Sequence, residues 1–199
     1  MNRPITAWLS IGSTYTYLTA LRLADIHRKL NLSLDIKPIS IRRIMQSMDN
    51  IPFPPSKKAK VDYMWRDIER RAEWYGLPRP TLPVPYPLQE FDRANMVGIV
   101  LNAKGRYLEY FEETYRLWFL EGLEAGSAEN LERCITGMGL DYQNIIAEAS
   151  EASIVASYEA NTDEAQAIGV FGAPSFSVGD EIFWGDDRLE DAIRHAGNG

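Results

Sequence analysis

The chain has 199 residues, of which 45% are hydrophobic and 25% are charged, as expected for a globular protein with a sizeable core. Its length predicts one large domain, or one domain with an insertion. The net charge of −7 argues against nucleic-acid partners and anionic membranes, and no apolar run approaches the ~20 residues of a membrane span. Residues 1–4 lack the apolar core of a signal peptide, so we expect a cytoplasmic protein without a membrane partner.

Cysteine and histidine are scarce in this sequence. Cys134 is the only cysteine, which excludes an internal disulfide and a C-x-x-C pair. The two histidines, His27 and His195, have no clustered ligands beside them, so we expect no metal site. Cys134 lies in a helical stretch, and we expect its thiol to be buried and inert.

The first forty residues have the pattern of a strand, a helix and a second strand. Residues 5–11 form an apolar run, residues 15–30 repeat apolar side chains at helical spacing, and residues 32–39 alternate with period two. This spacing predicts a right-handed βαβ unit. Ser13 stands in the turn before the helix, where its hydroxyl would either cap the helix or stabilise a bound anion.

The middle of the chain is helical and rich in proline near its start. Proline-rich loops are expected at residues 50–56 and 79–87, with a charged helix between them at 56–75. Further helices are expected at 92–103, 106–120, 128–137 and 141–167, the last broken near Ser150. One of them carries an aromatic stripe that core packing or a dimer face explains better than a cofactor site: Tyr107, Tyr110, Phe111, Tyr115, Trp118 and Phe119.

The C-terminal segment predicts two strands and a helix. Pro174 cannot donate to a sheet, so it should begin the first strand, and it is a candidate for a cis peptide bond. Gly-Asp at 179–180 suits a hairpin turn, and Asp186 or Asp187 stands where the last helix needs an N-cap. The chain therefore predicts an α/β, thioredoxin-like core of residues 1–40 and 165–199, with an all-helical insertion at residues 41–164.

Five motifs in order resemble one protein family over nearly the whole chain. They are Ser13 before an aromatic-rich helix, the segment from Asn50 to Lys60, Tyr-Gly-Leu-Pro at 75–78, Val-Phe-Gly-Ala-Pro at 170–174, and Trp-Gly-Asp-Asp-Arg-Leu at 184–189. This set resembles the 2-hydroxychromene-2-carboxylate isomerase family, within the kappa-class glutathione transferase and DsbA-like group. The Phe-Gly-x-Pro loop and the Trp-Gly-x-Asp-Arg-Leu run are its most specific parts.

The resemblance implies that glutathione is the cofactor. Ser13 would contact and activate its sulfur, and the backbone of Ala173 would pair with its cysteinyl unit like an added strand. Asp187 or Asp186 would face the ammonium group of its γ-glutamyl end. The full set of implied cofactor-binding residues is Ser13, Asn50, Lys60, Ala173, Pro174, Trp184, Gly185, Asp186 and Asp187.

The sequence departs from the family pattern at the active turn. Family members commonly have proline after the serine, whereas this chain has Thr14, so Ser10 or Thr14 could share or replace the role of Ser13. The residue between Gly185 and Asp187 is usually polar and neutral, and Asp186 makes this end unusually acidic.

A second departure concerns the substrate. Family isomerases resemble one another in a lysine suited to the substrate carboxylate, but Met45 stands at the corresponding position here. Arg42 and Arg43 precede it by one turn and could bind the carboxylate bidentately. Tyr86 falls near a family tyrosine that borders the substrate.

The implied activity is glutathione-dependent isomerisation of 2-hydroxychromene-2-carboxylate type, in the degradation of aromatic compounds. The thiolate activated by Ser13 would add reversibly to an aromatic-derived substrate; retention of the thiol would make the protein a kappa-like glutathione transferase instead. A second alternative is a non-catalytic protein that binds glutathione or a peptide, and the missing C-x-x-C argues against a disulfide oxidoreductase. Family members are commonly dimers, so we also expect a homodimer.

Overall fold

The computed structural model describes residues 3–50, 53–54 and 56–197. The expectation for residues 1–4 therefore lies partly outside the described residues, as does the predicted proline-rich loop at positions 51, 52 and 55. Among the described residues, no helix is long and apolar enough to cross a membrane. The same residues contain no group of three or more His, Cys, Asp or Glu side chains that could hold a metal ion.

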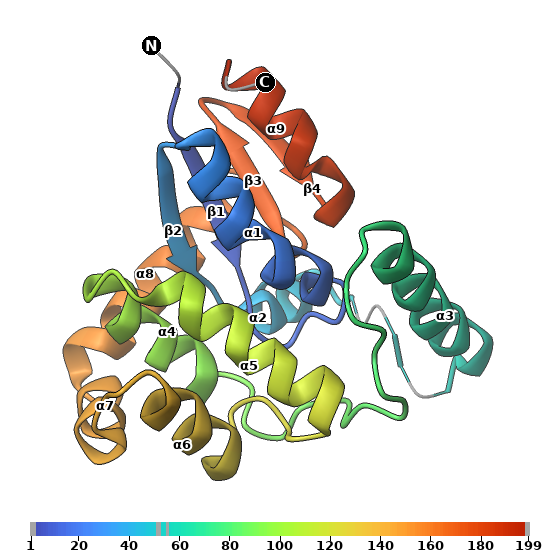
Figure 1. Cartoon of the computed structure of the whole chain (residues 1–199). Helices are drawn as coiled ribbons and strands as arrows, with labels where there is room; N and C mark the ends of the chain where they lie inside the picture. The colour runs from blue at the N-terminus through green and yellow to red at the C-terminus, as the bar shows by residue number, and fades with distance from the viewer. Residues whose placement is uncertain (1–2, 51–52, 55, 198–199) are drawn as a thin grey trace.

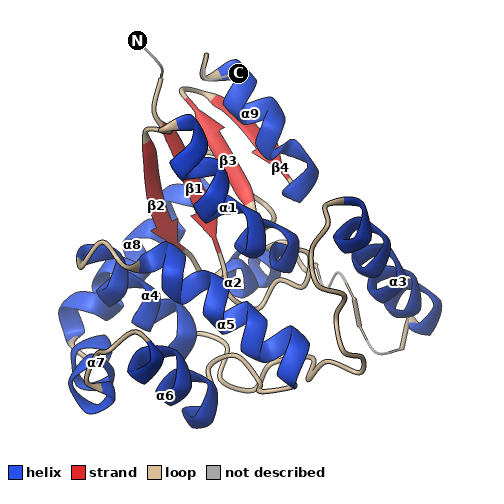
Figure 2. Cartoon of the chain, viewed as in Figure 1, coloured by secondary structure: helices blue, strands red, loops and turns tan. Residues whose placement is uncertain are grey.

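A mixed sheet forms the centre of the fold (Figure 2). Its strands stand in the order β2-β1-β3-β4. β1 pairs in parallel with β2, while β3 is antiparallel to both β1 and β4, which confirms the predicted βαβ unit and the predicted hairpin. The strand bounds are β1 Ile5–Leu9, β2 Leu34–Pro38, β3 Ser175–Val178 and β4 Glu181–Trp184.

Helices cover both faces of this sheet and extend beyond one end of it (Figure 1). In chain order they are α1 Thr16–Leu30, α2 Ile41–Ser47, α3 Lys58–Trp74, α4 Arg93–Ala103, α5 Tyr107–Glu121, α6 Ala128–Gly137, α7 Tyr142–Ala149, α8 Ala152–Ala167 and α9 Leu189–His195. The predicted break near Ser150 is confirmed, since this residue ends α7. The fold is thus a thioredoxin-like α/β core that carries additional helices between β2 and β3.

The alternation of β1 assigns each face of the sheet to a different core. Ile5, Ala7 and Leu9 point into the larger core, which they share with α1 and α5. Trp8 points to the other face, where it packs in a smaller cluster with Ala165 of α8. Because strand side chains alternate between faces, one five-residue strand anchors both layers.

The larger core draws side chains from both predicted parts of the chain. The whole aromatic stripe of α5 lies in it, with each side chain at most 2% exposed, so core packing explains the stripe. Cys134 is also fully buried there, and burial raises the pKa of its thiol to about 12. The expectation of a buried thiol is confirmed. The boundaries between the thioredoxin-like core and the helical insertion, placed at residues 40 and 165, stay a prediction.

Two predictions of local structure were wrong, and one helix was not predicted. The first strand ends at Leu9 instead of Ile11, because the Asn95 side chain takes the place of a neighbouring strand for Ile11, accepting from its N–H at 2.7 Å and donating to its C=O at 3.0 Å. Helix α2 was missed, since seven residues are too few for a periodic pattern. Asp186 and Asp187 do not cap α9; they form a short 3₁₀ turn that precedes it.

Candidate active site

A cavity of about 770 Å³ opens where the turn after β1 meets α2, α3 and the loop before β3. Its lining includes every predicted site residue but one: Ser13, Arg42, Asn50, Lys60, Tyr86, Ala173, Pro174, Trp184, Gly185, Asp186 and Asp187. Residues more than 160 positions apart in the chain therefore meet at one site. Arg43 is the exception.

Ser13 faces the loop before β3 and does not cap the helix. Its Oγ donates to the carbonyl oxygen of Ala173 at 2.7 Å, and the Ala173–Pro174 peptide bond is cis, as predicted. Helix α1 begins after Tyr15 without any side-chain cap. The Tyr115 hydroxyl donates to the Ser13 carbonyl at 2.8 Å and so fixes the backbone of the turn from below. The hydroxyl of Ser13 is therefore aimed across the cleft.

The start of α1 offers further donors beside Ser13. The backbone N–H groups of Thr14 and Tyr15 have no hydrogen-bond partner within the described part of the chain. Free N–H groups and the positive end of the helix dipole favour an anion at such a position. The site at Ser13 is thus chemically suited to a thiolate or another small anion.

The hydroxyls of Ser10 and Thr14 are directed differently from that of Ser13. Ser10 is fully buried, and its Oγ accepts from the N–H of Ile41 at 3.4 Å. Thr14 is also buried, and its Oγ1 donates to the sulfur of Met64 at 3.0 Å. The geometry therefore favours Ser13 over Ser10 and Thr14 as the hydroxyl that faces the loop before β3, although Thr14 also lines the cavity.

Two glycines permit close packing around the turn. Gly12 has φ +124°, and a Cβ there would lie 2.6 Å from the ring of Phe91, so this ring rests directly on the turn. On the opposite wall, a Cβ on Gly172 would lie 2.1 Å from the indole nitrogen of Trp184. Trp184 is 52% exposed and packs edge-on against Phe171, with 4.7 Å between ring centroids. It therefore forms part of the cleft wall and does not belong to the core.

The two neighbouring aspartates have different environments. Asp186 is only 3% exposed and accepts from Nη2 of Arg71 at 2.9 Å. Burial raises the pKa of Asp186, and the guanidinium of Arg71 opposes this rise. Asp187 keeps its carboxylate partly exposed and lies 3.6 Å from Arg188, which also pairs with Asp191 at the surface. Of the two, Asp187 is the carboxylate available to a ligand.

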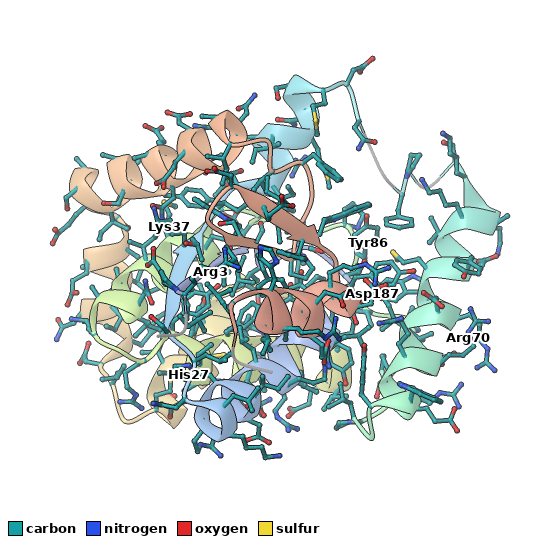
Figure 3. The ribbon with its side chains drawn as sticks, turned by 90° about the horizontal axis from the view of Figure 1, so that it is seen from above. Arg3, His27, Lys37, Arg70, Tyr86 and Asp187 are labelled. Atoms are coloured by element: carbon teal, nitrogen blue, oxygen red, sulfur yellow. The ribbon has the colours of Figure 1, made fainter. Side chains whose placement is uncertain are left out.

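The wall formed by α3 and its flanking loops is mixed in character. Lys60 is exposed, with its ammonium group 5.2 Å from the centre of the Phe53 ring. Tyr15 donates to Asp67 at 3.0 Å, and burial together with this carboxylate raises the pKa of its phenol well above the usual value. Figure 3 shows Tyr86 and Asp187 on the side of the core that faces α3. The wall thus combines aromatic surface with a small number of charges.

The adjacent arginines of α2 point to different places. Arg42 lines the cavity with its guanidinium carbon 5.5 Å from the centre of the Phe91 ring. Arg43 is turned toward α8, where it pairs with Asp163 and donates to the carbonyl of Glu159. The structure does not bring Arg43 to the cleft, because α2 directs side chains one position apart to different sides.

Sequence reasoning missed Phe91 and Arg71 as parts of the site. Neither lies in a motif, and each reaches the cleft from a distant helix or loop. The partner of Arg71 is 115 positions away, a separation that no periodic pattern could indicate. The signal that was present is the unusual acid at position 186, which required a cation if it was to be buried.

The fold and this site place the chain in the DSBA-like thioredoxin domain family, to which it belongs: the family model matches residues 4–195. Within that group it is similar to the 2-hydroxychromene-2-carboxylate isomerase of Sphingobium xenophagum, with 28% identity over 96% of both chains. It is also similar to the protein of that name from Pseudomonas putida, with 27% identity over 89% of this chain and 86% of the relative. The family resemblance of the motifs is therefore confirmed.

Solved structures agree on the fold. A 2-hydroxychromene-2-carboxylate isomerase superposes with a TM-score of 0.84 and 24% identity, over 97% of this chain and 94% of its own. A variant of DsbA from Pseudomonas aeruginosa superposes with a TM-score of 0.59 and 11% identity, over 98% of this chain and 86% of its own. The same fold is therefore found in proteins whose sequences differ widely from this one.

Proposed function

We propose that this protein is a glutathione-dependent isomerase acting on aromatic-derived carboxylates of the 2-hydroxychromene-2-carboxylate type. The names of its relatives, which match along nearly the whole chain, support the reaction class. The observation that carries the proposal is the Ser13 hydroxyl at the start of α1, 2.7 Å from the Ala173 carbonyl inside the cleft. A serine that only capped the helix would not point there.

The residues present fit a glutathione molecule. The N–H groups of Thr14 and Tyr15, which have no partner among the described residues, suit its sulfur. The backbone of Ala173, which lines the cavity, suits its peptide, and the Asp187 carboxylate suits its ammonium group. Bound glutathione would supply a nucleophilic thiolate. The role of the protein is to hold that group in its ionised form and to position it.

Ser13 could serve this role because a hydroxyl hydrogen can rotate from one acceptor to another. In the structure, its O–H donates to the carbonyl of Ala173. Rotation of the hydroxyl toward an anion at the helix end would release that carbonyl, which could then accept from a backbone N–H of the ligand. A hydrogen bond to a charged group contributes about 1.5–3 kcal/mol, which corresponds to about one to two pKa units of the thiol.

The substrate pocket would lie on the side of the cleft nearer α2. Apolar side chains there exclude water, and a low local dielectric strengthens the charge interactions that remain. The guanidinium of Arg42 lies over one side of the Phe91 ring, and the ring in turn rests on Gly12 of the active turn. Arg42 is therefore separated from that turn only by the Phe91 ring. We propose Arg42, and not Arg43, as the group that binds the substrate carboxylate. The apolar part of the wall comprises Ile41, Met45, Leu88 and Phe91.

The test is calorimetric binding of glutathione to the wild type and to Ser13→Ala, with thiolate absorbance recorded against pH. Wild type should bind and ionise the thiol near neutral pH, whereas Ser13→Ala should raise the apparent thiol pKa by about one to two units. Ser157→Ala, an exposed serine of α8, is the matched control and should behave like wild type. Binding without a Ser13-dependent thiolate would contradict the proposed activation.

Product analysis separates the isomerase from the transferase. An isomerase returns free glutathione after each turnover, whereas a transferase yields a product that contains it. The homodimer and the cytoplasmic location expected from the resemblance remain predictions alongside this assignment.

A further inference from the structure

A buried ion pair underlies the end of the cleft formed by the loop after β4. The Asp186 carboxylate, with its side chain 5% exposed, accepts from Arg71 Nη2 at 2.9 Å and from Nε at 3.3 Å. A buried carboxylate of this kind is costly unless it is paired and hydrogen-bonded. Arg71 meets that requirement, so the unusual acid in the sequence is neutralised inside the protein.

The contact with Asp186 does not occupy all the hydrogen-bond donors of Arg71. A guanidinium has five N–H donors. Nε and Nη2 of Arg71 serve Asp186 and the Tyr75 hydroxyl, the latter at 2.7 Å. The two donors of Nη1 have no partner within the part of the chain that the structure describes. The side chain remains 28% exposed and lines the cavity, so a free edge of the guanidinium faces the ligand space.

A second arginine keeps this arrangement rigid. Arg22 of α1 stacks on the Tyr75 ring, with its guanidinium carbon 3.7 Å from the ring centroid. It also donates to the backbone carbonyl of Asp186 at 3.0 Å and pairs with Glu190. Tyr75 and Asp186, the two partners of Arg71, are therefore themselves fixed by α1. A planar cation held in this way is preorganised to bind a carboxylate.

An anionic group lines the same end of the cleft. Asp187 follows Asp186 directly and keeps its carboxylate partly exposed at the cleft. It folds back over Gly185, where a Cβ would lie 2.6 Å from Asp187 Oδ1 and where φ is +117°. The Arg71 cation and the Asp187 anion thus both line this end of the cleft.

We propose that Arg71 holds the α-carboxylate of the amino acid group whose ammonium the family resemblance assigns to Asp187, so that this end of the cleft selects a zwitterion. Asp186 is a positioning residue that orients Arg71. The inference rests on the proposed function for the identity of the ligand, in which this group is the γ-glutamyl end of glutathione. A purely structural ion pair would not need a guanidinium edge in the cavity.

The experiment compares three ligands by calorimetry: glutathione, 4-aminobutyryl-cysteinyl-glycine, which lacks only the α-carboxylate, and glutaryl-cysteinyl-glycine, which lacks only the ammonium. Wild type should bind each analogue roughly 10- to 100-fold more weakly, as expected for the loss of one charge-assisted hydrogen-bond pair. Arg71→Gln should weaken glutathione by a similar factor and bind the carboxylate-free analogue with unchanged affinity. The preference for the α-carboxylate should then disappear.

Arg70→Gln is the matched control for Arg71→Gln. Arg70 is the neighbouring residue, pairs with Asp67 and does not line the cavity. Figure 3 shows it on the outer side of α3, away from Asp187. This variant should keep the full preference of wild type for glutathione over its carboxylate-free analogue.

Two further variants examine the positioning role. Arg71→Lys keeps the charge but loses the planar fork, so it should retain only part of the preference. Asp186→Asn should also reduce the preference for glutathione over the carboxylate-free analogue. It should leave unchanged the loss of affinity seen with the ammonium-free analogue. Restoration of the preference by Asp186→Glu would show that the carboxylate is needed. Should Asp186→Asn not fold, the Arg71→Lys result decides the question.

The outcomes separate this inference from the proposed function. If wild type binds glutathione as a Ser13-dependent thiolate yet binds the carboxylate-free analogue equally well, the Arg71 inference is overturned and the function stands. If the thiol-free tripeptide γ-glutamyl-2-aminobutyryl-glycine binds in an Arg71-dependent way but glutathione gives no thiolate, the inference is supported and the function fails. Failure of every γ-glutamyl ligand to bind wild type overturns both.

Discussion

Replacing Gly172 with alanine would place a methyl group inside the indole of Trp184. The new Cβ would lie 2.1 Å from the indole nitrogen and 2.7 Å from two ring carbons. Contacts between such atoms are favourable only near 3.5–4.0 Å, so the ring must move by more than about 1 Å. The backbone at Gly172 is not in the left-handed region, so the methyl group is the whole perturbation.

The cost to stability should be small because Trp184 is half exposed. The indole can swing outward, and what it gives up is mainly its edge-on contact with Phe171. Aromatic pairs of this kind contribute about 0.5–1.5 kcal/mol, so we expect about 1 kcal/mol of destabilisation. For a chain of this size that lowers the melting temperature by about 2–4 °C. The same movement alters the cleft wall, so ligand affinity should fall much more than stability.

Thermal unfolding and glutathione calorimetry on the same samples test this reasoning. Gly137→Ala is the matched control, since a Cβ there meets nothing within 4 Å and the residue lies at the end of α6. It should leave binding unchanged and keep or slightly raise the melting temperature. A Gly172→Ala protein that binds glutathione like wild type would show that Trp184 is not part of the site. A loss of stability above about 3 kcal/mol would show that the indole cannot move.

Two further predictions concern neighbouring or isolated side chains. Arg42→Gln should weaken binding of naphthalene-2-carboxylate roughly tenfold without affecting the neutral carboxamide. Arg43→Gln, which loses only contacts with α8, to Asp163 and to the carbonyl of Glu159, should affect neither, and equal effects of the two variants would contradict the assignment. With a pKa of about 12, the Cys134 thiol should stay protonated and unreactive toward disulfide reagents at pH 7–9 in the native protein and react only after unfolding, as followed by release of the chromophoric thiol.

Local patterns were enough to predict the sheet and most of the helices. The strands of the βαβ unit and the hairpin follow from short-range alternation, and the cis bond at Pro174 follows from a proline between a turn and a strand. Helix α2 escaped because it is short. The extent of β1 was misjudged because Asn95, which replaces the ladder beside Ile11, comes from another helix.

The site residues also differ in whether they could be predicted from local sequence or only from contacts made in the folded chain. Ser13 and Asp187 were predicted because they stand in motifs that keep their spacing. The choice between Arg42 and Arg43 could not be made from sequence, since both are about one turn from the expected lysine position. Only the orientation of α2 determines which of the two side chains points into the cleft. Arg71 was not predicted at all, because its role depends on a partner that only the folded chain brings near.

The two arginine pairs of this cleft illustrate one physical rule. In each pair, Arg42 with Arg43 and Arg70 with Arg71, adjacent residues on a helix carry the same charge but face different surroundings. Arg43 and Arg70 are matched by carboxylates at the surface, where an ion pair contributes little. Arg42 and Arg71 keep guanidinium surface in a largely apolar cavity, where a charged ligand group would be attracted more strongly than in water. The selectivity of the cleft should therefore depend on which arginine of each pair points into the cavity. That direction is set by the orientation of the helix and cannot be read from amino-acid composition.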